Sequence, residues 1–578
     1  MTVPADVNLP RHSMRRPLKR FFLTLWRHQW AVVGSLACSA FVLALVGLYR
    51  LTGDQGWSWP KAVYFALRLY GFNYDLSGDK GVPYADGNWQ LWAASFLAPA
   101  STVLAIAKTV AQSVVARLEL WHVYRMKKHA VICGAGERGR HLALSLRKQN
   151  KQVVVVDHKK DLEALTSLRA EGILTIQGDI TDPDTLSVAR IDTAYLVVAL
   201  TPSIEANLEV VLTASQRMKA KDGKALAYAP RAFATMFEGR SPFKRCENES
   251  QKHHVECGFF DHNATAARVL VSKYAPNLGP TVFREQRGAR ILVAGDGEVL
   301  PELLAVLIAQ CQFAGPHLPH ITVLTDDEDA IARGFPLYHP RMSLVVDLQK
   351  KLMPMAQMLS VSTKSLETSG KMQPYDLIFV ACREDGDTLT LATSLAQQES
   401  LTQKVVAGLT PSTQLEHKFE RYFQTPQPLE GVTLFNLLTL GCEARDVEQH
   451  ELDQRAKDIH RQYLEERKKH GGNTGNSLAM HAWEDLRGDF RESNRSAADH
   501  IAVKAQILRS SDSPETIELL AEAEHRRWMA ERIVSGWRYA TSRNDQKRLH
   551  HNFVPYAALS ESDREKDREN VRKALAIA

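Results

Sequence analysis

The sequence predicts a helical membrane hairpin with a pore-loop-like segment, then two α/β domains with doubly wound parallel sheets, and finally a small, mainly α-helical domain. Three observations predict this: two long uncharged apolar runs, a glycine-rich turn between strand and helix that occurs twice, and a last segment dense in aromatic and ionisable residues. A length of 578 residues requires several domains. With 44% hydrophobic and 24% charged residues, the composition excludes wholesale disorder and a polytopic transporter.

The charge balance and the cysteine content bear on whether the chain binds nucleic acid or zinc or forms disulfides. The chain has 72 Lys and Arg against 66 Asp and Glu, and a net charge of +6 over this length does not predict nucleic-acid binding. Its 7 cysteines are scattered and form no CxxC pair, so neither a disulfide framework nor a cysteine-based zinc site is indicated. We expect no metal site, no nucleic-acid partner, and a reducing cytosol around most of the chain.

Two apolar runs predict the membrane part. Residues 30–49 and 89–107 carry no charge, and each is long enough to cross the bilayer as a helix. The first could instead be a signal peptide, but it exceeds the roughly 7–15 apolar residues of such segments, and a second run follows. Residues 1–29 and 108–128 are basic, whereas the intervening loop is balanced. The positive-inside rule therefore predicts an inner-membrane hairpin over 30–115, with a basic N-terminus (1–29) and the large C-terminal part in the cytoplasm.

The loop between the runs predicts a short re-entrant helix, because Trp59-Pro60 opens a stretch that ends before Gly71. Such backbone must be buried in protein or line water, which implies oligomerisation around an aqueous axis. The order of span, short helix, loop and span resembles two-span potassium channels. That resemblance implies a homotetramer in which carbonyls at the filter position coordinate a permeant cation; the filter position covers Tyr70, Gly71, Phe72, Asn73 and Tyr74. The TVGYG stretch of that family is absent and Arg68 adds a cation, so a plain hairpin is the alternative.

The first α/β domain begins with a strand at 130–133 that runs into Gly134-Ala135-Gly136 and, after two residues, Gly139. A helix follows, and the next strand closes with Asp157 about twenty residues later, which is the context of a dinucleotide-binding turn. Gly134 would permit the tight turn, Gly136 the approach of a pyrophosphate, and Gly139 close packing of the helix. The alternative is a glycine turn in an α/β unit that binds no ligand.

The continuation adds Gly178-Asp179 and further alternating strands and helices. Over residues 129–245 the pattern resembles the regulator-of-potassium-conductance (RCK) domain, also called the Trk-type NAD-binding domain. The resemblance implies that this Rossmann-like domain binds NAD(H) or another adenine nucleotide and passes force to a pore. The binding residues that it implies are Gly134, Gly136, Arg138, Gly139, Asp157, Gly178 and Asp179.

A second, incomplete copy is predicted over residues 288–425. Gly295 and Gly297 follow an apolar strand, but Leu300 stands at the third glycine position. Further strands are predicted at 344–346 and 376–381. Because a leucine hinders close packing of helix on sheet at that position, we expect this Rossmann-like copy to be structural.

The C-terminal part is predicted as a charged helical linker (430–509) and a compact domain (513–576). Glu524, His525 and Trp528 lie at helical spacing, and Gly536-Trp537 and Val554-Pro555-Tyr556 follow. This pattern resembles the RyR domain, named after ryanodine receptors. We predict a pocket here for an anionic, adenine-like ligand, because stacking rings and cations recognise such groups; its candidate residues are Arg532, Trp537, Tyr539, Lys547, His550 and Tyr556. The alternative is a packed aromatic core with a shell of salt bridges.

Together these features predict a homotetrameric cation channel, similar to potassium channels, in which a nucleotide-type ligand of the cytoplasmic domains gates the pore. The partners are the lipid bilayer, further copies of the chain, the nucleotide and the permeant cation. No nucleophile–base pair or hydride acceptor site accompanies the glycine turn, so we expect no enzyme activity and no catalytic residue. The alternative is a non-conducting, membrane-tethered nucleotide sensor or scaffold.

Overall fold

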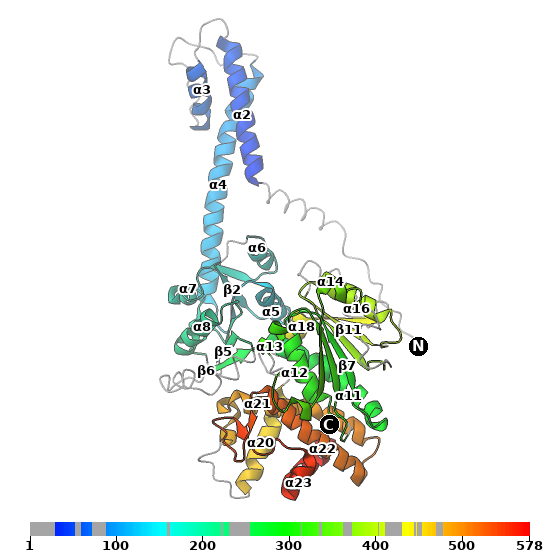
Figure 1. The fold of residues 1–578 in the computed structure, drawn as a ribbon. Helices are drawn as coiled ribbons and strands as arrows, with labels where there is room; N and C mark the ends of the chain where they lie inside the picture. The colour runs from blue at the N-terminus through cyan, green and yellow to red at the C-terminus, as the bar shows by residue number, and fades with distance from the viewer. Residues whose placement is uncertain are drawn as a thin grey trace, which may run out of the picture. The chain divides into compact units, whose positions relative to one another are not determined.

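The computed structural model describes residues 29–52, 59–71, 88–158, 162–220, 223–230, 255–313, 315–334, 338–361, 373–402, 404–410, 431–443, 447, 453–469 and 478–577. The chain forms two compact units, residues 1–122 and 123–578, and each is described by itself. Figure 1 labels their helices and strands.

The first unit contains two helices long and apolar enough to cross a membrane. Helix α2 covers Gln29–Thr52, and helix α4 covers Trp89–Arg125 and continues into the second unit. Their apolar stretches are Val33–Arg50 and Trp89–Val110. Between them lie α3 (Trp59–Arg68) and the 3-10 turn Leu69–Gly71. Helix α4 runs through Pro99 without interruption in its helical assignment.

Small residues bring α2 and α4 close together. A Cβ atom added at Gly47 would lie 2.9 Å from both the Cβ and the backbone nitrogen of Leu91. Asn88 donates a hydrogen bond of 2.8 Å from its side chain to the Gly47 carbonyl oxygen. Ala40 and Ala44 are buried in the same small core, whereas larger side chains such as Ile106 are exposed. Close backbone approach at small residues with apolar groups outside is typical of packed membrane helices.

The first sheet of the second unit has six parallel strands in the order β3-β2-β1-β4-β5-β6. The strands are β1 (Ala130–Cys133), β2 (Val153–Asp157), β3 (Leu174–Gln177), β4 (Leu196–Ala199), β5 (Gly223–Tyr228) and β6 (Val255–Phe260). The helices between them are α5 (Glu137–Lys148), α6 (Leu162–Ala170), α7 (Pro183–Val188) and α8 (Ile204–Arg217). This is the predicted doubly wound sheet, but its last strand lies beyond the expected boundary at residue 245.

The second sheet has the order β12-β11-β10-β7-β8-β9, which is the same winding as the first when counted from β7. Its strands are β7 (Arg290–Ala294), β8 (His320–Thr325), β9 (Asp347–Leu352), β10 (Leu377–Val380), β11 (Val405–Leu409) and β12 (Val432–Asn436). Its helices are α11 (His262–Arg284), α12 (Leu300–Gln310), α13 (Glu328–Gly334), α14 (Met355–Met358), α16 (Asp385–Ala396) and α18 (Leu437–Gly441).

Two predictions for this sheet are wrong in position. Residues 344–346 are not a strand: a 3-10 turn covers Met342–Leu344 and β9 begins at Asp347. Strand β9 is an edge strand with partly exposed, charged side chains, so it lacks the apolar run that predicts a buried strand. Strand β12 lies past the expected end at 425, within the segment predicted as a helical linker.

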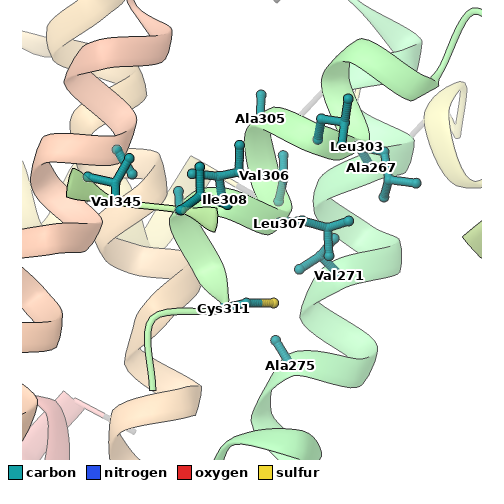
Figure 2. Close-up of a cluster of buried hydrophobic side chains, with 14 of the residues drawn as sticks. Ala267, Val271, Ala275, Leu303, Ala305, Val306, Leu307, Ile308, Cys311 and Val345 are labelled. Carbon is teal, nitrogen blue, oxygen red and sulfur yellow. The ribbon is translucent and has the colours of Figure 1, made fainter. Parts of the chain in front are cut away.

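The C-terminal part packs directly on the second sheet's helices. It contains α20 (Gln454–Lys469), α21 (Gly488–Leu508), α22 (Pro514–Val534), the short strands β13 (Arg538–Tyr539) and β14 (Leu549–His550), and α23 (Glu561–Ile577). Every residue of α12 is buried, and this helix packs against α11, α21 and α22 (Figure 1). Figure 2 shows Val306 and Leu307 of α12 in the cluster that also holds Val271 of α11. The second sheet and the C-terminal helices therefore share one hydrophobic core.

Buried ions reinforce this junction. Glu524 accepts hydrogen bonds from the Lys504 ammonium group at 2.9 Å and from the Arg527 guanidinium at 2.9–3.1 Å. Arg527 also donates to the Ser496 hydroxyl at 2.9 Å, and the Gln310 amide of α12 donates to the Ser496 carbonyl oxygen at 3.0 Å. Because all these charges are paired, their burial is tolerated, and the pairing fixes α21 and α22 on α12.

Candidate functional site

The glycine turn of the first sheet joins β1 to α5. Gly134 has a φ of +112°, which side chains disfavour, and a Cβ at Gly139 would lie 1.9 Å from the Gly134 carbonyl oxygen. The fold therefore requires glycine at both positions. Gly136 is different, because its φ of −62° suits any residue and an added Cβ would meet no heavy atom of the described residues within 4 Å.

The open space beside Gly136 lies at the N-terminus of α5. Gly136 is the N-cap, so the N-cap residue has no side chain that could cap this helix. The first N–H groups of a helix lack partners within the helix and, with its dipole, attract anions. Strand β1 lies between β2 and β4, so this turn occupies the point where the strand order reverses, where doubly wound sheets bind their ligands.

Asp157, Gly178 and Asp179 lie at the same carboxyl edge of the sheet: Asp157 ends β2, and Gly178 and Asp179 follow β3. The Asp157 carboxylate accepts a hydrogen bond of 2.5 Å from the Ala135 backbone nitrogen, so it holds the glycine turn in place. A Cβ at Gly178 would lie 2.6 Å from the Thr185 side chain. Asp179 accepts hydrogen bonds of 2.9 and 2.8 Å from the Thr181 backbone nitrogen and hydroxyl, and the first of these is the main cause that lowers the pKa of Asp179.

Arg138, in the first turn of α5, lies against the second α/β domain. Its guanidinium is 4.5 Å from the centre of the Tyr228 ring at the end of β5. One of its nitrogens is 2.7 Å from the Glu298 carboxylate, which follows the second glycine turn. Burial raises the pKa of Tyr228 to about 12, so the ring is neutral beneath the cation. Arg138 thus connects the two glycine turns.

Residues 381–383, which follow β10, pack against the second glycine turn. Gly297 donates its N–H to the Ala381 carbonyl oxygen at 3.0 Å, and a Cβ at Gly297 would lie 2.9 Å from that oxygen. The Arg383 backbone nitrogen donates to Asp296 at 2.9 Å, and its guanidinium donates to Asp327 at 2.9 Å. The Gly297 N–H and the Asp296 carboxylate, which would otherwise be available to a nucleotide, are therefore already hydrogen-bonded to residues of the same domain. This arrangement favours a structural role for the second copy.

A cavity of about 410 Å³ lies between the carboxyl edges of the two sheets. The first sheet contributes Arg138, Pro202, Ile204 and Tyr228, and the second contributes Asp296, Glu298, Thr325, Asp327 and Arg383, among others. The Arg138–Glu298 ion pair is part of its lining.

A second cavity, of about 230 Å³, lies in the C-terminal part. Within the described part of the chain its lining is mainly aromatic and cationic and has no acidic residue: it consists of His460, Tyr463, Ala479, Leu486, Phe490, Ser493, Asn494, Trp528, Arg532, Trp537, Arg543 and His550. The Arg532 guanidinium is 4.7 Å from the centre of the Trp537 ring and 4.9 Å from that of Phe490. A flat, electron-rich anion fits such a lining better than a cation does.

Beside this cavity, Asp489 acts as a fully buried counter-ion. It accepts hydrogen bonds of 2.5 and 2.6 Å from Arg487 and one of 2.8 Å from the Trp537 indole. Arg532 and Arg548 approach it at 4.0 and 3.8 Å. Burial alone would raise the pKa of Asp489, but the hydrogen bonds and charge of Arg487, followed by the charges of Arg532 and Arg548, lower it. Asp489 is therefore a counter-ion shared by three arginines, of which Arg532 also lies 3.5 Å from the Glu531 carboxylate.

His550 supplies a neutral hydrogen-bond donor to this cavity. The Asn552 backbone nitrogen donates to Nδ1 of His550 at 3.0 Å, so Nε2 carries the proton of the neutral ring. Burial, followed by the charge of Arg543, lowers the pKa of His550 to about 3. The ring therefore stays neutral at physiological pH.

The structure brings together only part of the predicted pocket. Arg532, Trp537 and His550 line the cavity, whereas the other three candidates lie elsewhere. The Tyr539 ring lies under the Arg341 guanidinium at 3.9 Å, Lys547 is exposed, and Tyr556 lies beside His525.

Sequence reasoning missed the wall formed by His460, Tyr463 and Phe490. These residues belong to the segment predicted as a solvated linker, and its charged composition gives no sign that one face of α20 and the start of α21 cover an aromatic cluster. A search for aromatic residues at helical spacing within that segment is the signal that could have found them.

The predicted filter position is described only in part. The Tyr70 hydroxyl donates to the Ala37 carbonyl oxygen of α2, so this ring packs on α2. Gly71 ends the 3-10 turn, and residues 72–74 lie outside the described residues. The Arg68 guanidinium lies 5.3 Å from the centre of the Phe65 ring.

Comparison with known proteins identifies two parts of the chain. Residues 130–234 match the TrkA-N domain family, and residues 504–577 match the RyR domain family. An uncharacterized protein of Methanothermus fervidus is 31% identical over 91 residues, 16% of this chain and 14% of the relative. The Trk system potassium uptake protein trkA homolog 1 of Methanosarcina mazei is 39% identical over 94 residues, 16% of this chain and 22% of the relative. The chain thus spans less than a quarter of the length of these relatives.

Solved structures of GsuK are similar over longer stretches but at low scores. The crystal structure of GsuK bound to ADP has a TM-score of 0.36 and 15% identity, over 74% of this chain and 99% of that chain. The GsuK channel bound to NAD has a TM-score of 0.35 and 13% identity, over 76% and 86%. The sequence matches, together with the two six-stranded parallel sheets, show that the chain contains a TrkA-N domain and a RyR domain.

Proposed function

We propose that the first α/β domain binds NAD(H) or another adenine nucleotide, with its phosphates at the N-terminus of α5. The observation that carries this proposal is the open space beside Gly136, which is the N-cap of α5 and has no side chain of its own to cap the helix. The TrkA-N match over residues 130–234 supports it. Among the implied residues, Gly136 and Arg138 would meet the phosphates, while Asp157 would exchange its contact with Ala135 for a ribose hydroxyl.

We further propose that nucleotide occupancy controls the flux of a cation, potassium first among the candidates, through an oligomer of the membrane hairpin. The relatives named as Trk potassium uptake proteins and the two candidate spans support a role in potassium transport. In this proposal four copies form the pore in the inner membrane, and the cytoplasmic part performs no catalysis. A coupling of roughly 1–3 kcal/mol per site would change the open probability about 5–150-fold.

Flux through liposomes tests this function. The full chain is reconstituted and potassium efflux is measured without ligand and with NAD⁺, NADH, ADP, ATP and cyclic nucleotides. We expect efflux that changes with at least one adenine nucleotide in the parent protein and does not change in the Gly136→Val variant. Vesicles that stay sealed under every condition would contradict the channel proposal.

Arg68 gives a reason to retain the second candidate function. A cation beside Tyr64 and Phe65 at the end of α3 is unusual for a helix that supports a cation filter. If vesicles stay sealed while the nucleotide still binds, the protein acts as a membrane-tethered sensor or scaffold.

The C-terminal cavity is a second candidate ligand site. Aromatic walls, the guanidinium groups of Arg532 and Arg543 and the neutral His550 ring suit an anionic, adenine-like molecule of about one ring system. Calorimetry with the same nucleotides tests this site: Arg532→Met should remove a second binding event while the first remains.

A further inference from the structure

We propose that Arg138 is a latch: the nucleotide phosphate and Glu298 compete for its guanidinium, so that nucleotide binding releases Glu298 and breaks this contact between the two α/β domains. This inference rests on the proposed nucleotide site and concerns its regulation. It starts from the ion pair of 2.7 Å between Arg138 and Glu298, which joins the two glycine turns across the cavity of about 410 Å³.

Each partner is fixed to its own sheet. Arg138 is in the first turn of α5, directly after the open Gly136, and its guanidinium rests on Tyr228 at the end of β5. Glu298 follows Gly297, whose N–H is bonded to Ala381 next to β10. The ion pair therefore joins the two carboxyl edges through two side chains whose backbones belong to different sheets.

The two anions exclude one another at this site. A phosphate at the N-terminus of α5 lies next to the base of the Arg138 side chain, and guanidinium–phosphate pairs are strong and directional. If Glu298 stayed bound to the same guanidinium, two anions would lie close together in a partly enclosed cavity. Glu298 is the more exposed partner, with 68% of its side chain accessible against 24% for Arg138, so it is the group that leaves.

A second junction joins the two domains beside this cavity, because Asp261 and Asn263, which flank His262, are part of the cavity lining. A Cβ at Gly441 of α18 would lie 2.2 Å from the His262 carbonyl oxygen of α11, and Cys442 and Val447 belong to a core of the first sheet. This junction remains when the latch is released, so nucleotide binding breaks only the contact at Glu298. By reciprocal linkage, any force that separates the domains also raises nucleotide affinity.

Calorimetry on the full chain in nanodiscs tests the latch with NAD⁺ and ADP as probes. Glu298→Gln frees Arg138 while keeping the size of the side chain, and we expect binding to tighten roughly 2–6-fold, because a paired arginine reduces the competent fraction by about that factor. The control Glu285→Gln removes a surface acid that pairs with Arg287, and its affinity should equal the parent's. Unchanged or weaker binding in Glu298→Gln would overturn the latch but leave the nucleotide site intact.

A ligand-free measurement separates the latch from the site. Thermal unfolding of the parent, Arg138→Ala, Glu298→Ala and the double variant should show that the losses of stability in the two single variants do not add up in the double variant. The charge swap Arg138→Glu with Glu298→Arg should restore the stability that the ion pair contributes. The swapped variant should still bind nucleotide at least tenfold more weakly than the parent, because no guanidinium remains at α5. Additive single variants would overturn the latch. If the parent binds neither probe, the proposed nucleotide site fails, and the latch fails with it.

Discussion

Three of the glycines in the two turns, Gly136, Gly139 and Gly297, allow a sharp test of where the nucleotide binds. In Gly136→Val, the added Cβ meets no described heavy atom within 4 Å, and the backbone at φ −62° and ψ 178° accepts valine. The expected cost to folding is at most about 1 kcal/mol, from a poorer N-cap. The same side chain stands between the helix N-terminus and an approaching phosphate. Losing one hydrogen bond to a charged group costs roughly 1.5–3 kcal/mol, which weakens binding about 10–150-fold.

Two matched variants, Gly139→Ala and Gly297→Ala, should lose stability, which Gly136→Val should keep. In Gly139→Ala, a methyl group 1.9 Å from the Gly134 oxygen forces the turn apart, so stability falls by roughly 1–3 kcal/mol or more. In Gly297→Ala, the methyl group meets the Ala381 oxygen at 2.9 Å, so stability falls while nucleotide binding is retained.

The assay combines isothermal titration with NAD⁺ or ADP and urea unfolding of the same samples. We expect Gly136→Val to lose nucleotide affinity in the titration while its free energy of unfolding in urea stays close to that of the parent. If Gly136→Val binds as tightly as the parent, the phosphates do not lie on this turn, and the reasoning from its open geometry is refuted.

Two further predictions concern buried carboxyl groups. Asp489→Asn leaves three arginines around a neutral group, so the free energy of unfolding should fall by about 3–5 kcal/mol, and an unchanged urea midpoint would contradict the counter-ion role. Burial, followed by the charge of Glu524, raises the pKa of Asp567 to about 8 beside Nδ1 of His525. Since this folded-state pKa exceeds the unfolded value near 4, stability from this group is greatest below pH ~4 and falls by about 1.4 kcal/mol per unit up to pH ~8. Asp567→Asn should flatten that slope between pH 5.5 and 7.5, and an equal slope in both proteins would rule Asp567 out as its source.

The turn of the first sheet could be read from local sequence. Gly134, Gly139 and Asp157 follow from the short-range steric needs of a strand, a turn and a helix, and the apolar runs of α2 and α4 follow from the length needed to cross a bilayer. Strands β1, β2 and β4 are buried on both faces, so they appear in the sequence as continuous apolar runs and can be predicted from them.

Other features depended on contacts that no local pattern encodes. Strand β9 is charged because it lies at a sheet edge, and the role of Asp157 as a brace for Ala135 depends on the turn closing over it. The C-terminal cavity needs α20 and α21 folded against Trp537, across about seventy residues of chain.

What the sequence by itself determined were the elements whose signals are short-range: the two apolar helices, the glycine turn and the alternating α/β pattern. The tertiary structure alone decided that Arg383 fills the second turn, that Arg138 reaches Glu298, and that the C-terminal helices share a core with α12. The physical reason is that ion pairs and packing join residues by distance in space, and that distance is set only after both sheets have formed.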